Sequence, residues 1–133
     1  MNKIRIFLCL CLVNTTFAQK SVNVGFYCGE ELSYPKIAEQ YESLIKTQNY
    51  NKIVKGLYSK NVAENYFSVI VSEKLESLGK IVLSKKDSEV ILKIRNSSRK
   101  VNVCEGCGVS EKTLKETFEA LKSSAEFWLQ QYF

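Results

Sequence analysis

The chain has 133 residues, which is the size of one small domain, and its formal net charge at pH 7 is +5. Its 19 basic residues are spread along the sequence rather than gathered, so we do not expect it to bind nucleic acid. It contains no histidine, which excludes Ser-His-Asp and Cys-His catalysis as well as histidine-ligated zinc.

Residues 1–18 have the organisation of a cleavable signal peptide. Lys3 and Arg5 give a positive start, an apolar stretch follows, and small and polar side chains lead up to Ala18. The apolar stretch is much shorter than the roughly 20 residues that span a bilayer. We therefore predict export to the periplasm or the outside after cleavage near Ala18. Residues 19–133 would then form a single domain with no membrane span.

After this segment the pattern changes from extended to helical. Val22, Val24 and Phe26 alternate with polar or small neighbours, which predicts a short edge strand or an extended arm within residues 21–34. From Pro35 onward, apolar residues recur with the spacing of a helix face. This spacing predicts helices over residues 35–48, 51–58, 62–78, 85–95 and 110–130.

Two of these helices carry clear start signals. Asn61 and Glu64 have the spacing of a capping box, and Ser84 is an N-cap residue placed before the helix over 85–95. Gly79 is a natural C-terminal stop for the helix over 62–78. That helix is apolar around much of its circumference, so we expect it to lie at the centre of the core.

The remaining connections indicate the fold class. Residues 81–83 fit either a strand or a packing linker, and residues 96–109 read as a loop. Five helices with short connections predict an all-α array with an extended N-terminal arm.

Residues 59–75, preceded by Tyr50–Tyr58, resemble one helical hairpin of a HEAT-type repeat. In that family, stacked helix pairs form scaffolds or bind partners, so the resemblance implies such a role here. The order of Cys28-Gly29, helical hairpins and a Cys-x-x-Cys before the last helix also resembles small uncharacterised exported proteins of the Bacteroidota. That second resemblance implies no activity.

Three cysteines remain after the predicted cleavage, namely Cys28, Cys104 and Cys107. In an oxidising compartment, neighbouring thiols form disulfides. We expect Cys28 to pair with Cys104 or Cys107, tying the arm to the segment before the last helix and leaving one thiol over. Closing such a loop contributes about 4–5 kcal/mol in the chain-entropy model.

The same cysteines also fit a second hypothesis. Cys104-Glu105-Gly106-Cys107 has the spacing of a redox pair, and a following helix N-terminus would favour a thiolate. With Cys28, the pair also supplies three soft ligands for a metal such as Cu(I). A fourth ligand for zinc would have to come from Glu105, Glu30 or water.

Aromatic residues gather at the C-terminus. We expect Phe127 and Trp128 to pack in the core, and Tyr132 and Phe133, beyond the helix, to be available for contact with a partner. Together these features predict an exported, non-enzymatic interaction or structural module with a protein partner and no cofactor. The alternative is a thiol-disulfide or soft-metal protein that works through Cys104 and Cys107.

Overall fold

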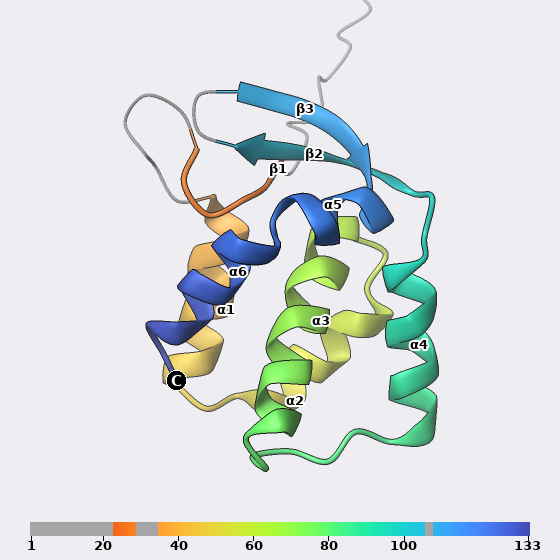
Figure 1. Ribbon diagram of the computed structural model, residues 1–133. Coiled ribbons are helices and arrows are strands. Elements are labelled where there is room, and N and C mark those ends of the chain that lie inside the picture. Colours follow the sequence, from red (N-terminus) through yellow and green to blue (C-terminus); the bar gives the residue numbers. More distant parts are fainter. Residues whose placement is uncertain (1–22, 29–34, 106–107) are drawn as a thin grey trace, which may run out of the picture.

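A computed structural model describes residues 23–28, 35–105 and 108–133 of the chain. Within these ranges, six α-helices lie on one side of a small three-stranded sheet, which is at the top of Figure 1. The predicted signal peptide and Cys107 lie outside the described residues. In chain order the elements are β1 (Asn23–Val24), α1 (Lys36–Lys46), α2 (Tyr50–Lys55), the 3-10 helix η1 (Gly56–Tyr58), α3 (Val62–Ser77), α4 (Lys85–Arg95), β2 (Lys100–Glu105), β3 (Gly108–Thr113), α5 (Leu114–Ala120) and α6 (Lys122–Gln130).

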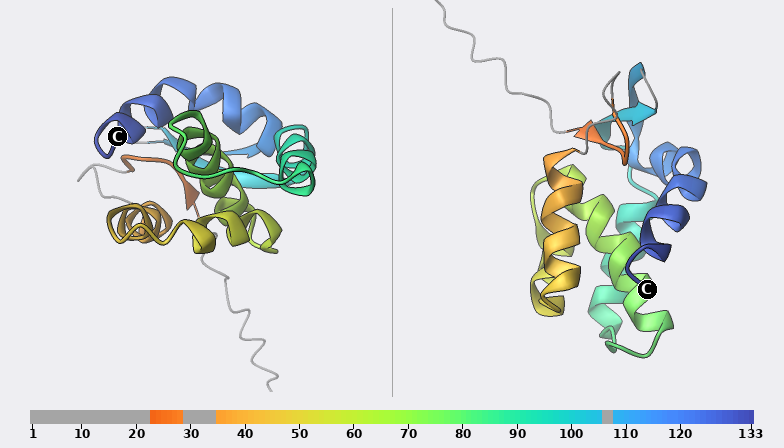
Figure 2. Two further views of the ribbon diagram at one scale, coloured as in Figure 1. Left: turned by 90° about the horizontal axis from the view of Figure 1, so that it is seen from below. Right: turned by 90° about the vertical axis from the view of Figure 1, so that its left-hand side faces the viewer.

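Helix α3 is the central helix, as its all-round apolar sequence predicts. It contacts α1, α2, α4, α5 and α6 as well as strands β1 and β2. Viewed along the molecule, it lies between α1 and α2 on one side and α5 and α6 on the other (Figure 2). Its residues from Asn65 to Ser72 are all buried. Packing on every side of this helix, rather than helix propensity alone, therefore stabilises it.

The predicted ends of α3 and α4 are confirmed, but the predicted capping box of α3 is only half formed, because the Asn61 amide donates to Ser59 rather than to Glu64. Asn61 accepts hydrogen bonds from the first amides of α3, and Ser84 forms a complete capping box with Asp87 at the start of α4. Gly79 follows α3 with a φ of +68°. The amides of Gly79 and Lys80 donate to carbonyls of the last turn, which is the bonding of a Schellman motif.

The segment predicted as a loop over residues 96–109 instead contains β2 and the start of β3. Strand β2 is central, with β1 parallel on one edge and β3 antiparallel on the other. The registers pair Val24 with Val103 and Cys104 with Val109. Val101 and Val103 are buried. The mostly helical architecture is confirmed, but the all-α class is corrected by this sheet, and β1 is the predicted short edge strand.

The last predicted helix, over residues 110–130, starts later and bends. Residues up to Thr113 belong to β3, and Thr113 caps α5 in a second capping box with Glu116. A bend at Leu121 then separates α5 from α6, and the Leu121 carbonyl accepts the first hydrogen bond of α6, from the Ala125 amide at 2.8 Å. The change of direction lets Trp128 of α6 pack on Phe67 of α3.

An aromatic cluster joins the N-terminal arm to the helices. The ring of Phe26 lies 5.4 Å from Trp128 and 5.6 Å from Phe67, between ring centroids. Phe127, by contrast, is 59% exposed, so its predicted place in the core is wrong. Successive residues of a helix point about 100° apart, so Trp128 and Phe127 do not share a face.

No helix in the described ranges is long and apolar enough to cross a membrane. Residues 81–83 form the linker between α3 and α4, in which Leu83 is buried and Val82 is 95% exposed.

Candidate functional site

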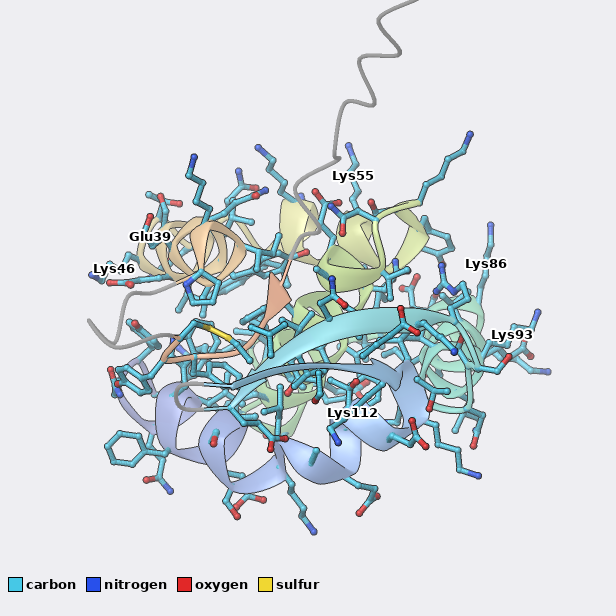
Figure 3. All side chains as sticks on the ribbon, turned by 90° about the horizontal axis from the view of Figure 1, so that it is seen from above. Glu39, Lys46, Lys55, Lys86, Lys93 and Lys112 are labelled. Atoms are coloured by element: carbon cyan, nitrogen blue, oxygen red, sulfur yellow. A yellow bond between two sulfur atoms is a disulfide. The ribbon has the colours of Figure 1, made fainter. Side chains whose placement is uncertain are left out.

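Cys28 and Cys104 form a disulfide between the N-terminal arm and strand β2. Their Cα atoms are 5.5 Å apart, within the usual range for a disulfide, and they are separated by 76 residues in the sequence. The bond is drawn in yellow in Figure 3. The predicted pairing of Cys28 with one of the two later cysteines is therefore confirmed, and its partner is Cys104.

The backbone of Gly25 lies directly against this disulfide. A Cβ atom at Gly25 would stand 2.2 Å from Sγ of Cys104 and 2.7 Å from its carbonyl oxygen. Only glycine leaves room for this approach. The short arm is thus bound to β2 by three features, namely the parallel pairing of β1, the disulfide and the contact at Gly25.

The thiol-disulfide and soft-metal hypothesis assumed a pair of cysteines just before the start of a helix, and the structure places Cys104 in a different environment. Cys104 is buried and bonded to Cys28, and it lies in a strand rather than before a helix. In the described part of the chain, no group of three His, Cys, Asp or Glu side chains is placed to hold a metal. Cys107 and Glu30 lie outside the described residues.

The C-terminal turn contacts the arm that carries Cys28. Gln131 donates a hydrogen bond of 3.4 Å to the hydroxyl of Tyr27. Tyr132 and Phe133 are half-buried and pack against the core, with the Tyr132 ring 5.2 Å from Trp128. Burial, and to a lesser extent the nearby Glu42 carboxylate, raises the pKa of Tyr132 to about 12.

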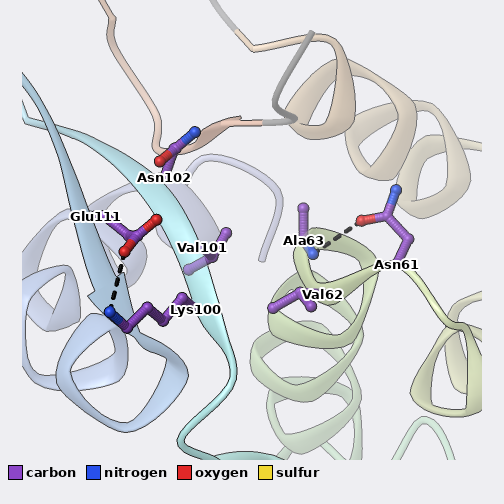
Figure 4. A pocket seen from close by; sticks show the side chains of 7 residues that line it. All are labelled: Asn61, Val62, Ala63, Lys100, Val101, Asn102 and Glu111. Carbon is purple, nitrogen blue, oxygen red and sulfur yellow. Dashed lines mark hydrogen bonds and ion pairs between the residues drawn. The ribbon is translucent and has the colours of Figure 1, made fainter. Parts of the chain in front are cut away.

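A cavity of about 230 Å³ lies between β2, β3 and the start of α3 (Figure 4). Lys100 and Glu111 line it and pair with each other at 3.1 Å. The side-chain oxygen of Asn61 accepts a hydrogen bond of 2.9 Å from the Ala63 amide. Lys100, Glu111 and Asn61 therefore already have partners within the protein.

A second cavity, of about 270 Å³, lies between α3, α4, α5 and α6. Arg95 is one of the residues that line it. Its Nε donates a hydrogen bond of 3.0 Å to Glu73, its Nη2 donates to the same carboxylate, and its Cζ lies 4.6 Å from the Phe118 ring centroid. The side chain of Tyr66, fully buried, also lines this cavity. Apolar and charged residues complete the lining, namely Ile70, Ala125, Leu129, Glu119, Lys122 and Glu126.

Sequence reasoning did not find this second cavity. Three basic residues that are close together in the sequence each bind a different partner: Arg95 binds Glu73, Arg99 binds Asn65 and Lys100 binds Glu111. These partners come from other elements, 22 and 34 residues away for the two arginines. No local spacing signals such contacts.

Comparison of the chain with protein-family models, with curated proteins and with solved structures gave no match.

Proposed function

We propose that this chain is an exported, non-enzymatic helical domain with a structural or partner-binding role, held together by the Cys28–Cys104 disulfide. One observation carries the proposal. The disulfide joins the arm that follows the two-residue edge strand β1 to the central strand of the sheet, between residues 76 positions apart in the sequence. A strand this short forms too few backbone hydrogen bonds to stay paired without further support.

The chemistry of the bond supports export. Disulfides persist in oxidising compartments and are rare where glutathione and thioredoxin keep thiols reduced. Closing a loop of this length contributes about 4.5 kcal/mol in the chain-entropy model, against a total stability of about 5–15 kcal/mol for a typical domain. A domain that depends on this bond would fold best outside the cytoplasm, in agreement with the predicted signal peptide over residues 1–18.

The distribution of charged groups supports a non-enzymatic role. A general acid or base must have its titrating atom within hydrogen-bond reach of the reacting group of a substrate. Here Arg95 is engaged by Glu73, and Lys100 pairs with Glu111. The acidic side chain of Asp87 accepts a hydrogen bond of 2.6 Å from Tyr58.

The test is expression of the full chain in a bacterial host, followed by non-reducing peptide mass spectrometry of the periplasmic fraction. We expect an N-terminus at or near Gln19 and a peptide pair linked through Cys28 and Cys104. The Cys28→Ser variant should lose several kcal/mol of unfolding free energy, whereas the matched Cys107→Ser variant should keep the linked pair and its stability. Retention of residues 1–18 in the cytoplasm, or a Cys28→Ser variant as stable as the parent, would refute the proposal.

The same preparation separates this proposal from thiol-disulfide exchange. Reduction of insulin by the purified protein, lost in Cys107→Ser, would assign the function to the Cys104-Glu105-Gly106-Cys107 segment instead. Stoichiometric metal in protein purified under reducing conditions would point to the soft-metal alternative.

A further inference from the structure

We infer that the cavity between α3, α4, α5 and α6 is a binding site for a small neutral molecule that has one ring and a hydrogen-bond acceptor. This inference does not depend on the proposed function. It rests on three features of the cavity, namely its size, its buried hydroxyl and the balance of its charges.

The size of the cavity suits a single ring. A dry apolar cavity of about 150 Å³ holds benzene, and sites for drug-sized ligands have volumes of about 300–1,000 Å³. At about 270 Å³, this cavity has room for one ring with a short substituent. Its apolar lining comes from Ile70 of α3, Phe118 of α5, and Ala125 and Leu129 of α6.

The buried hydroxyl of Tyr66 supplies the polar contact. Tyr66 is fully buried, and its ring packs on Phe118 with 4.9 Å between centroids. Among the described residues, no group forms a hydrogen bond with its hydroxyl. A ligand that fills the cavity and accepts a hydrogen bond from this hydroxyl should bind more tightly than one that cannot, because a ligand without an acceptor would leave the donor without a partner. Burial also raises the pKa of Tyr66, so the hydroxyl keeps its proton and can donate.

The charges around the cavity disfavour an ionic ligand. The guanidinium of Arg95 is already neutralised by Glu73 and covers Phe118. At the exposed rim, the single cation Lys122 is accompanied by two carboxylates, Glu119 and Glu126. An anion would meet this excess of negative charge, and a cation beside Tyr66 would lose hydration and meet the positive charge of Arg95, which acts on Tyr66.

The binding test adds three probes of similar size to the purified protein. Acetophenone is neutral and carries an acceptor, ethylbenzene lacks the acceptor, and benzoate is an anion. In titrations followed by ¹H–¹⁵N NMR, we expect acetophenone to shift the amides of residues that line this cavity, and the other two probes to bind more weakly. Acetophenone shifts confined to other surfaces, or none at concentrations up to about 10 mM, would overturn the inference.

A matched pair of variants then tests the role of the hydroxyl. Tyr66→Phe removes only the buried hydroxyl, and Tyr58→Phe makes the same change on η1, outside the cavity. We expect Tyr66→Phe to weaken acetophenone binding by about tenfold, the effect of one net hydrogen bond, and to leave ethylbenzene binding unchanged. Tyr58→Phe should leave the affinity for both probes unchanged. Equal acetophenone affinity in Tyr66→Phe and the unmodified protein would show that the hydroxyl does not contact the ligand.

Discussion

Arg99 donates a hydrogen bond of 2.8 Å from Nη2 to the side-chain oxygen of Asn65, which joins the residue before β2 to the interior of α3. The amide nitrogen of Asn65 donates in turn to the carbonyls of Gly56, Leu57 and Ser59, at 2.9, 3.2 and 3.0 Å. Asn65 is almost completely buried. One side chain thus bonds three carbonyls around η1, of which that of Gly56 also accepts from the Ser59 amide.

Replacing Asn65 by leucine should destabilise the domain by about 2–4 kcal/mol. The apolar side chain has a similar size but leaves several carbonyls and the Arg99 guanidinium without their partner. Urea denaturation under non-reducing conditions measures the loss. The control is Asn96→Ala, since the Asn96 amide donates to the Leu92 carbonyl at the surface and should cost less than about 1 kcal/mol. Equal losses in the two variants would show that the buried network adds no stability.

Replacing each of two buried serines of α3 by alanine should change the unfolding free energy in different directions. Both Ser68 and Ser72 are fully buried. The Ser68 hydroxyl hydrogen-bonds the Tyr41 hydroxyl at 2.5 Å, whereas the Ser72 hydroxyl has no partner within the described residues. Ser68→Ala should lower the unfolding free energy by about 1–2 kcal/mol, and Ser72→Ala should raise it or leave it unchanged. Thermal melts of the two variants make the comparison, and a loss in Ser72→Ala as large as in Ser68→Ala would contradict it.

Gly25→Ala should prevent the disulfide from forming in its native position. The added methyl would overlap Cys104, so either the arm must move away or the sulfur must shift. We expect a higher free-thiol content in the exported protein and a lower melting temperature. Gly108→Ala is the matched control, because a Cβ there meets no atom closer than 3.8 Å. Complete disulfide formation in Gly25→Ala would show that the arm accommodates the methyl group.

The parts of the fold that depend on local sequence could be predicted from the sequence. Asn61, Ser84 and Gly79 form their bonds with residues only a few positions away. Asn61 therefore marks the start of α3 in the sequence, Gly79 marks its end, and Ser84 marks the start of α4. The bounds of α4, Lys85–Arg95, agree with the prediction. The cysteine pairing could be narrowed to two partners but not to one, because both candidates lie close together in the sequence.

The sheet and the second cavity depend on contacts between distant segments. Strand β3 is exposed along much of its length, so it lacks the apolar alternation that identifies a half-buried strand. A local signal was nevertheless present, because Thr113 and Glu116 have capping-box spacing and mark the start of α5. The bend at Leu121 could not be predicted, because no proline or glycine lies near it in the sequence. The cavity beside Tyr66 exists only because four helices meet there, which no local pattern encodes.

Asp87 should make the stability of the domain depend on pH on the acid side. The hydrogen bond from Tyr58, and secondarily those from Ser84, hold the pKa of Asp87 below its ordinary value. A carboxyl whose pKa is lowered by folding adds stability above its unfolded pKa of about 3.9, and this stability is lost as the pH falls through the folded pKa. Tyr58→Phe removes the largest cause, so the acid-side loss should begin at higher pH. ¹³C NMR titration of the Asp87 carboxyl measures its pKa directly, and an identical value in Tyr58→Phe would show that this hydrogen bond does not lower it.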